Sequence, residues 1–115
     1  MKYLLLSAII LTSYTANAQV KAQLLGCWKM PSRPGETLQL NGDGNFFFND
    51  YNTMTKATEK FYGTWKIEKK TVTLMYDDRP QQRFFLSRDK KGQWILKKAG
   101  GFQFIKGTPA ECEAR

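Results

Sequence analysis

The sequence contains no histidine, and this absence excludes several kinds of chemistry. Without histidine there is no imidazole general base, no Ser–His or Cys–His nucleophile pair and no histidine ligand for zinc or haem. Adjacent carboxylates occur at Asp77 and Asp78, where Arg79 and Pro80 follow in a sequence typical of a turn. We therefore expect no enzymatic activity, no catalytic residues, no metal ligands and no cofactor.

Long hydrophobic runs are also scarce. The one apolar run of note, Leu4–Leu11, is shorter than the ~20 residues that cross a membrane. Lys2 precedes this run and Ala16–Ala18 follows it, which is typical of a secretory signal peptide with an A-x-A cleavage site. A short anchoring or buried N-terminal helix is the alternative.

We expect cleavage between Ala18 and Gln19, which removes residues 1–18 as the signal peptide. Residues 19–115 then form a single small domain. The protein is expected to be exported, to the periplasm or outside the cell, without stable insertion into a membrane.

Cysteine is rare as well, with Cys27 and Cys112 as the two examples. An even number of cysteines in an exported chain predicts a disulfide, which at this separation stabilises a fold by roughly 4–5 kcal/mol. Leu24–Cys27 also looks like a lipobox, the motif at which bacterial cysteines are lipidated. A polar stretch separates it from the apolar run, so lipidation of Cys27 is kept as the alternative.

Acidic residues are few: 10, against 18 lysines and arginines, for a net charge of +8. An exported basic protein favours acidic partners, such as anionic envelope polymers or lipid head groups, although a charged outer face for solubility explains the same excess. Aromatic residues lie between basic ones in Arg83–Arg88, as in some nucleic-acid-binding barrels. Export argues against a nucleic-acid role, and nothing in the sequence indicates the oligomeric state.

What the sequence does contain is a series of short segments with alternating apolar residues, separated by turn residues. They predict an all-β fold: an eight-stranded antiparallel up-and-down meander that closes into a small barrel, with no helix. Asp50–Thr58 is expected to be the longest polar connection. The predicted strands are Leu24–Met30, Glu36–Leu40, Asn45–Asn49, Glu59–Ile67, Thr71–Tyr76, Arg83–Arg88, Gln93–Lys98 and Phe102–Lys106.

Alternation along these segments separates an inner from an outer face. The exposed rings of Phe47, Tyr62 and Phe85 would mark a binding patch if they cluster. The side chains expected inside are Trp28, Met30, Phe46, Phe48, Phe61, Trp65, Ile67, Val72, Leu74, Phe84, Leu86 and Phe104.

Each tryptophan follows a glycine by two positions, in Gly26-Cys27-Trp28, Gly63-Thr64-Trp65 and Gly92-Gln93-Trp94. Glycine in a strand permits a bend or a close backbone approach, and the tryptophan is expected to fill the space beside it. The first two motifs, together with the glycine-rich hairpin Asn41–Asn45, resemble those of short exported bacterial lipocalin-like (calycin) domains. The resemblance covers about Leu24 to Lys106.

This resemblance implies a small barrel that binds a small apolar ligand or an envelope component. We place the expected pocket at the open end, near Trp28, Phe46, Phe48, Tyr51 and Trp65. In these families a disulfide often ties the C-terminal tail to the barrel, which implies a bond between Cys27 and Cys112. Cys27 lies between Gly26 and Trp28, so we expect it to point outward, where the tail could reach it. The alternative function is a filled barrel that acts as a periplasmic protein-interaction or hydrolase-inhibitor domain, because eight strands leave an interior just wide enough for side chains to fill.

Overall fold

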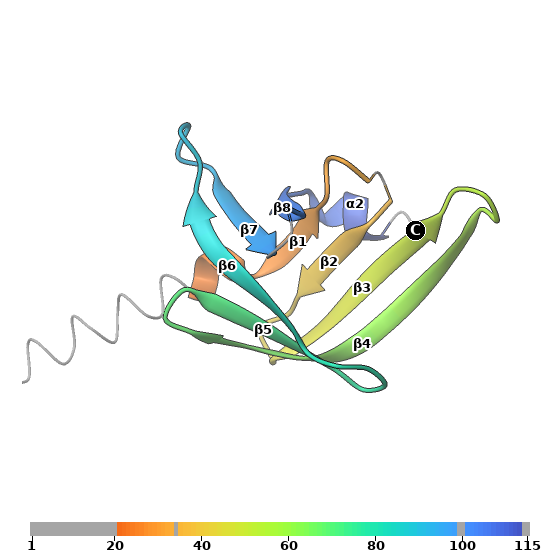
Figure 1. The fold of residues 1–115 in the computed structure, drawn as a ribbon, viewed down its shortest axis with the longest axis horizontal. Helices are drawn as coiled ribbons and strands as arrows, with labels where there is room; N and C mark the ends of the chain where they lie inside the picture. Colours follow the sequence, from red (N-terminus) through yellow and green to blue (C-terminus); the bar gives the residue numbers. More distant parts are fainter. Residues whose placement is uncertain (1–20, 34, 99–100, 114–115) are drawn as a thin grey trace, which may run out of the picture.

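The computed structural model describes residues 21–33, 35–98 and 101–113, and these form a closed antiparallel β-barrel (Figure 1). Each strand pairs with the next, and β8 pairs with β1, as the predicted meander requires. The predicted signal peptide, residues 1–18, and its cleavage site between Ala18 and Gln19 lie outside the described residues. The strands are β1 (Gly26–Lys29), β2 (Thr37–Leu40), β3 (Asn45–Asn52), β4 (Ala57–Glu68), β5 (Thr71–Tyr76), β6 (Gln82–Arg88), β7 (Trp94–Lys98) and β8 (Gln103–Lys106).

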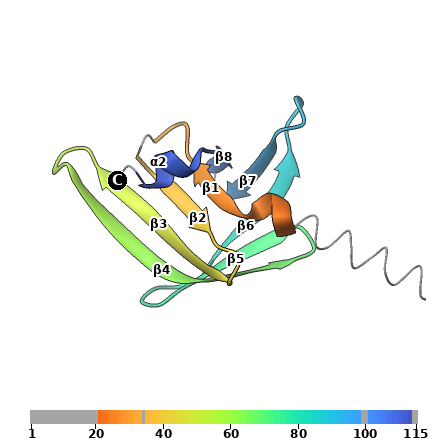
Figure 2. The ribbon, with the colours of Figure 1, turned by 180° about the vertical axis from the view of Figure 1, so that it is seen from behind.

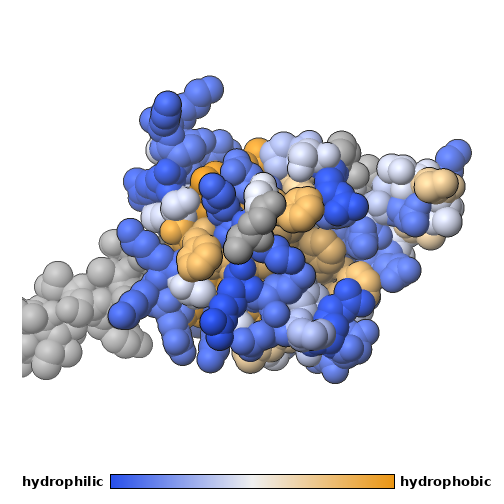
Figure 3. Space-filling model, viewed as in Figure 1, coloured by the Kyte–Doolittle hydropathy of each residue, from blue (hydrophilic) through white to orange (hydrophobic). Residues whose placement is uncertain are grey.

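The hydrophobic core fills most of the barrel, and alternation predicted most of its members. Phe48, Phe61 and Ile67 are only partly buried, whereas Leu24, Leu38, Leu40 and Leu96 join the core in addition. Hydrophilic side chains cover most of the outer surface seen in Figure 3. The buried core consists of Leu24, Trp28, Met30, Leu38, Leu40, Phe46, Trp65, Val72, Leu74, Phe84, Leu86, Leu96 and Phe104.

A helical segment, residues 21–24, lies at the end of the barrel where β1 begins (Figure 2). Leu24 is fully buried there, and its carbonyl accepts a hydrogen bond from Nε1 of Trp28 at 2.8 Å. Nε1 of Trp65 donates similarly to the carbonyl of Asn41 at 2.9 Å. Among the described residues, the side chains at this end are therefore packed together, and the predicted strand start at Leu24 is wrong because that residue belongs to the helical turn.

A second helix, α2 (Pro109–Glu113), packs against the outside of β1 and β2 (Figure 2). The backbone N–H of Thr108 donates to Oε1 of Glu111 at 2.9 Å, which is the side-chain half of a capping box. The prediction of a chain without helices is therefore wrong. The sequence does contain a signal for this helix: Thr108 and Glu111 have the Thr-x-x-Glu spacing of a capping box, and Pro109 occupies the first helical position.

The predicted disulfide between Cys27 and Cys112 is confirmed, and it ties α2 to the barrel. Both cysteines are buried on the outer side of the sheet, so Cys27 points outward as expected. Beside them, Nδ2 of Asn49 donates to the carbonyl of Cys112 at 3.1 Å and to Oγ1 of Thr37 at 2.9 Å. The bonded sulfur of Cys27 leaves no thiol for a lipid, and the disulfide fits an oxidising compartment.

The hairpin of β3 and β4 is longer than the sequence predicted. Residues 50–58, expected as a polar connection, mostly continue the two strands, which pair out to Asn52 and Ala57. Figure 1 shows this hairpin projecting beyond the barrel. Both faces of the hairpin tip are in water, so its residues show no apolar alternation. The sequence therefore predicted a polar connection where the strands continue.

The glycines of the Gly-x-Trp motifs have different roles. A Cβ on Gly63 would lie 2.1 Å from the carbonyl oxygen of Met75 and 2.8 Å from Cε1 of Phe46. The space at Gly63 is thus filled by Phe46 and the neighbouring backbone, not by Trp65 as expected. Gly92, with φ of 81°, belongs to the turn before β7 and is not a strand start.

Candidate binding site at the barrel mouth

The end of the barrel opposite the helical residues 21–24 holds a cavity of about 210 Å³ that opens to solvent. Residues from the ends of six strands and the loops beside them form it, and we call it the mouth cavity. Its lining residues are Met30, Arg33, Glu36, Phe48, Asp50, Phe61, Tyr76, Arg79, Gln82, Phe84, Lys98, Phe102 and Phe104.

Aromatic rings form the wall of the mouth cavity. The ring of Phe48 lies 6.4 Å from that of Phe61 and 6.2 Å from that of Phe104, measured between centroids. Phe104 in turn meets Phe84 edge-on at 5.6 Å. Phe102 is 43% exposed, so apolar surface at the mouth remains in contact with water.

Two carboxylates lie at inward-facing positions on one side of the mouth. Glu36 and Asp50 follow directly on the Thr37–Asn49 cross-strand pair, so the two carboxyl groups lie near each other. The side chain of Glu36 is buried and receives an ion pair from Nε of Arg33 at 3.1 Å. Burial raises the pKa of Glu36, and the charge of Asp50 raises it further, while Arg33 opposes both effects.

A guanidinium lies on the other side of the mouth. Cζ of Arg79 is 3.8 Å from the ring centroid of Phe61 and 5.7 Å from that of Tyr76, within the range of a cation–π interaction. The hydroxyl of Tyr76 donates to Oε1 of Gln82 at 2.6 Å. Burial raises the pKa of Tyr76 to about 12 despite the nearby Arg79, so this hydroxyl remains a neutral donor.

The residues predicted to line a pocket are only partly brought together. Phe48 lines the mouth cavity. Trp28, Phe46 and Trp65 are packed in the core, each no more than 5% exposed. Tyr51 packs against the backbone of Gly35, where a Cβ would lie 2.7 Å from the Tyr51 Cβ, and it does not line the cavity.

The charged rim was missed in the sequence, although a signal for it exists. Glu36, directly before β2, and Asp50, in β3, fall at inward positions by the same alternation that placed Leu38 and Phe48 inside. Charged residues at inward positions near a strand end indicate an open mouth, because an uncompensated charge in a closed core is too costly. Lys98, two residues beyond buried Leu96, follows the same rule.

The described parts of the chain hold no group of three or more His, Cys, Asp or Glu side chains arranged to bind a metal ion. No helix among the described residues is long and apolar enough to span a membrane. Comparisons of the chain with models of known protein families, with curated proteins and with solved structures found no match. The site is therefore interpreted from its own geometry.

Proposed function

We propose that the protein is an exported, non-enzymatic, lipocalin-like binding module, and that its barrel mouth receives the apolar part of a small ligand. One observation carries the proposal: the barrel is packed over most of its length, yet its mouth holds a cavity with aromatic walls and a charged rim. Binding sites for small molecules combine apolar walls with a few polar groups that fix the orientation of the ligand.

The size and charge of the mouth cavity define the ligand class. Its volume of about 210 Å³ is below the ~300–1,000 Å³ of pockets that enclose drug-sized ligands. One ring or a short chain therefore enters, while the rest of the ligand stays at the rim. Three cations and two carboxylates line the cavity, and this positive balance favours a ligand with an acidic end.

Two further observations support the export and binding parts of the proposal. The disulfide is of the kind found in proteins of oxidising compartments, in agreement with the expected signal peptide. The absence of histidine from the whole sequence removes the commonest acid–base catalyst and favours binding over catalysis.

The test is a fluorescence titration with 8-anilinonaphthalene-1-sulfonate, an aromatic probe that carries one acidic group. Phe102→Ser removes an exposed ring at the mouth, and Phe85→Ser removes a similarly exposed ring (52%) on the outer face of β6. We expect Phe102→Ser to weaken binding about fivefold, corresponding to ~1 kcal/mol of lost apolar contact, and Phe85→Ser to leave it unchanged. Equal effects of the two variants would mean that the probe does not bind in the mouth.

The charge requirement is tested separately with Arg79→Gln. This variant keeps a polar side chain at the rim but removes the cation near Phe61 and Tyr76. Decanoate should displace the probe from the wild type better than decanol does, and Arg79→Gln should reduce that difference. Equal displacement by the acid and the alcohol in the wild type would contradict the acidic-end assignment.

A second candidate function is protein interaction by a barrel with a filled core, for example as a hydrolase inhibitor. The projecting β3–β4 hairpin favours it, because Met54 at the tip is 91% exposed. A pull-down from envelope extract at low salt tests this function by comparing the wild type with Met54→Ser. Failure of the wild type to capture a partner, or equal capture by both proteins, would contradict a role for the hairpin.

A further inference from the structure

The outer face of β4, β5 and β6 carries a hollow of about 390 Å³, which is separate from the mouth cavity. Lys66, Thr73 and Arg83 lie side by side in register across the three strands. We call this hollow the outer groove. It is lined by Lys66, Glu68, Lys69, Thr71, Thr73, Gln81 and Arg83.

The outer groove is positively charged. It holds three cations and one carboxylate, and that carboxylate, Glu68, pairs with Lys66 at 3.5 Å in a largely exposed contact of little strength. Within the described residues, Lys69 and Arg83 make no ion pair. Two of the three cations are therefore not neutralised by any described part of the chain, and this favours an anionic partner.

The spacing of the cations favours an extended polyanion. Lys66 and Arg83 are separated by two strand spacings, about 10 Å, with Thr73 between them. A single small anion cannot contact both side chains at once without drawing them together over the threonine. A polymer with acidic groups on successive units can contact both, while the hydroxyl of partly buried Thr71 hydrogen-bonds between those groups.

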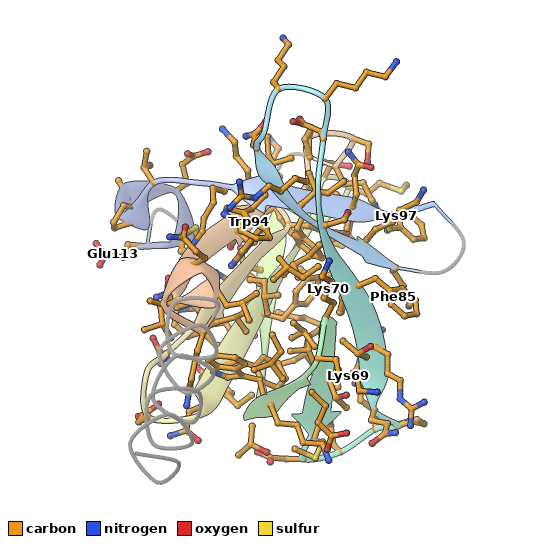
Figure 4. The ribbon with its side chains drawn as sticks, turned by 90° about the vertical axis from the view of Figure 1, so that its left-hand side faces the viewer. Lys69, Lys70, Phe85, Trp94, Lys97 and Glu113 are labelled. Atoms are coloured by element: carbon orange, nitrogen blue, oxygen red, sulfur yellow. A yellow bond between two sulfur atoms is a disulfide. The ribbon has the colours of Figure 1, made fainter. Side chains whose placement is uncertain are left out.

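An exposed aromatic ring lies directly beside the outer groove. Phe85 is 52% exposed, with groove residue Thr71 on one side and Lys97 on the other in the strand register. Figure 4 shows Lys69, Lys70, Phe85 and Lys97 on the same side of the barrel. The negative face of an aromatic ring attracts polarised C–H groups, such as those on the face of a sugar ring.

We propose that the outer groove and Phe85 bind an acidic polysaccharide. The acidic groups pair with Lys66, Lys69 and Arg83, the sugar hydroxyls hydrogen-bond to Thr71 and Gln81, and one sugar ring stacks on Phe85. A hollow with a single large exposed apolar side chain does not match a flat bilayer surface. One exposed ring also falls short of the series of stacking platforms that single-stranded nucleic acids require.

The test measures binding of dextran sulfate, with uncharged dextran as the matched probe. The groove variant is Lys66→Gln/Lys69→Asn/Arg83→Gln, where asparagine suits the φ of 57° at Lys69. Its control, Lys56→Asn/Lys90→Gln/Lys91→Gln, removes the same charge from exposed loops and also includes a residue with φ of 57°. We expect at least tenfold weaker binding for the groove variant, less than threefold for the control, and no binding of dextran.

Equal losses in the two triple variants would overturn the proposal, because binding would then follow net charge alone. Phe85→Ser should weaken dextran sulfate binding about threefold without changing its salt dependence, since stacking releases no ions. Phe102→Ser should have no effect on dextran sulfate binding, so the proposals for the outer groove and for the mouth cavity can be refuted independently of each other. Tighter binding to phosphatidylglycerol vesicles or to oligo(dT) than to dextran sulfate would also overturn the proposal.

Discussion

The disulfide is expected to provide much of the stability of this small domain. Cys27 and Cys112 are 85 positions apart, and the chain-entropy relation for a loop of that length gives about 4.6 kcal/mol at 25 °C. Small domains have total stabilities of roughly 5–15 kcal/mol. Reduction should therefore lower the melting temperature by about 20 °C or more.

Urea unfolding, with and without dithiothreitol, measures this effect. The variant Cys27→Ala/Cys112→Ala supplies a second measurement in which no thiol can reoxidise. In both cases we expect a lower midpoint, because the untethered unfolded chain has more conformations available. Hydrogen exchange should also show weaker protection of the backbone amides of α2, since the disulfide joins that helix to β1.

A loss of less than about 1 kcal/mol on reduction would refute this reasoning, because it would mean that the cross-link does little to restrict the conformations of the unfolded chain. The ion pair between Lys29 and Glu111, at 3.1 Å and about one-third exposed, also joins α2 to β1, but it is too weak to account for a loss of several kcal/mol. Lys29→Gln is the control, and it should change the unfolding free energy by no more than about 0.5 kcal/mol.

Two further predictions concern the barrel itself. Gly63→Ala should destabilise the fold by about 3 kcal/mol in urea unfolding, because its Cβ would meet the Met75 carbonyl. The control is Gly42→Ala, whose Cβ would make an ordinary contact at 3.7 Å and should cost less than about 0.5 kcal/mol. Similar losses in the two variants would contradict the close approach at Gly63. The raised pKa of Glu36 means that the folded state favours the protonated acid, so stability is lost as the pH rises above 4.5 and through that pKa. Glu36→Gln should therefore become more stable relative to the wild type as the pH rises, and a constant difference would contradict a buried Glu36.

The strand meander could be predicted because burial on one face leaves a strong alternation in the sequence. Val72 and Leu74 alternate with Thr71 and Thr73, and in the barrel the first pair is fully buried. Where a strand loses its buried face, this signal disappears. The projecting tip around Met54 is the clearest example, since its residues pair only with each other across the hairpin.

The mouth cavity was harder to predict, because its position depends on how far each part of the barrel is filled. Trp28 and Trp65 were expected near a pocket as large inward rings. The helical residues 21–24 instead pack over that end of the barrel, and both indole N–H groups are satisfied by backbone carbonyls. A ring whose polar atom is already bonded within the core contributes to packing and is not available to a ligand.

The two ends of the barrel therefore differ for a physical reason. At the packed end, inward positions hold apolar side chains of sufficient volume to fill the interior, as eight strands allow. At the mouth, inward positions hold Glu36, Asp50 and Lys98, which need water or a polar partner and so prevent the aromatic wall from closing. The burial of Glu36 opposes its ionisation at neutral pH, whereas apolar residues at these positions would fill the mouth without that cost. Residues that keep apolar surface open at the expense of stability are expected at a binding site. The disulfide on the outer face can offset that loss of stability.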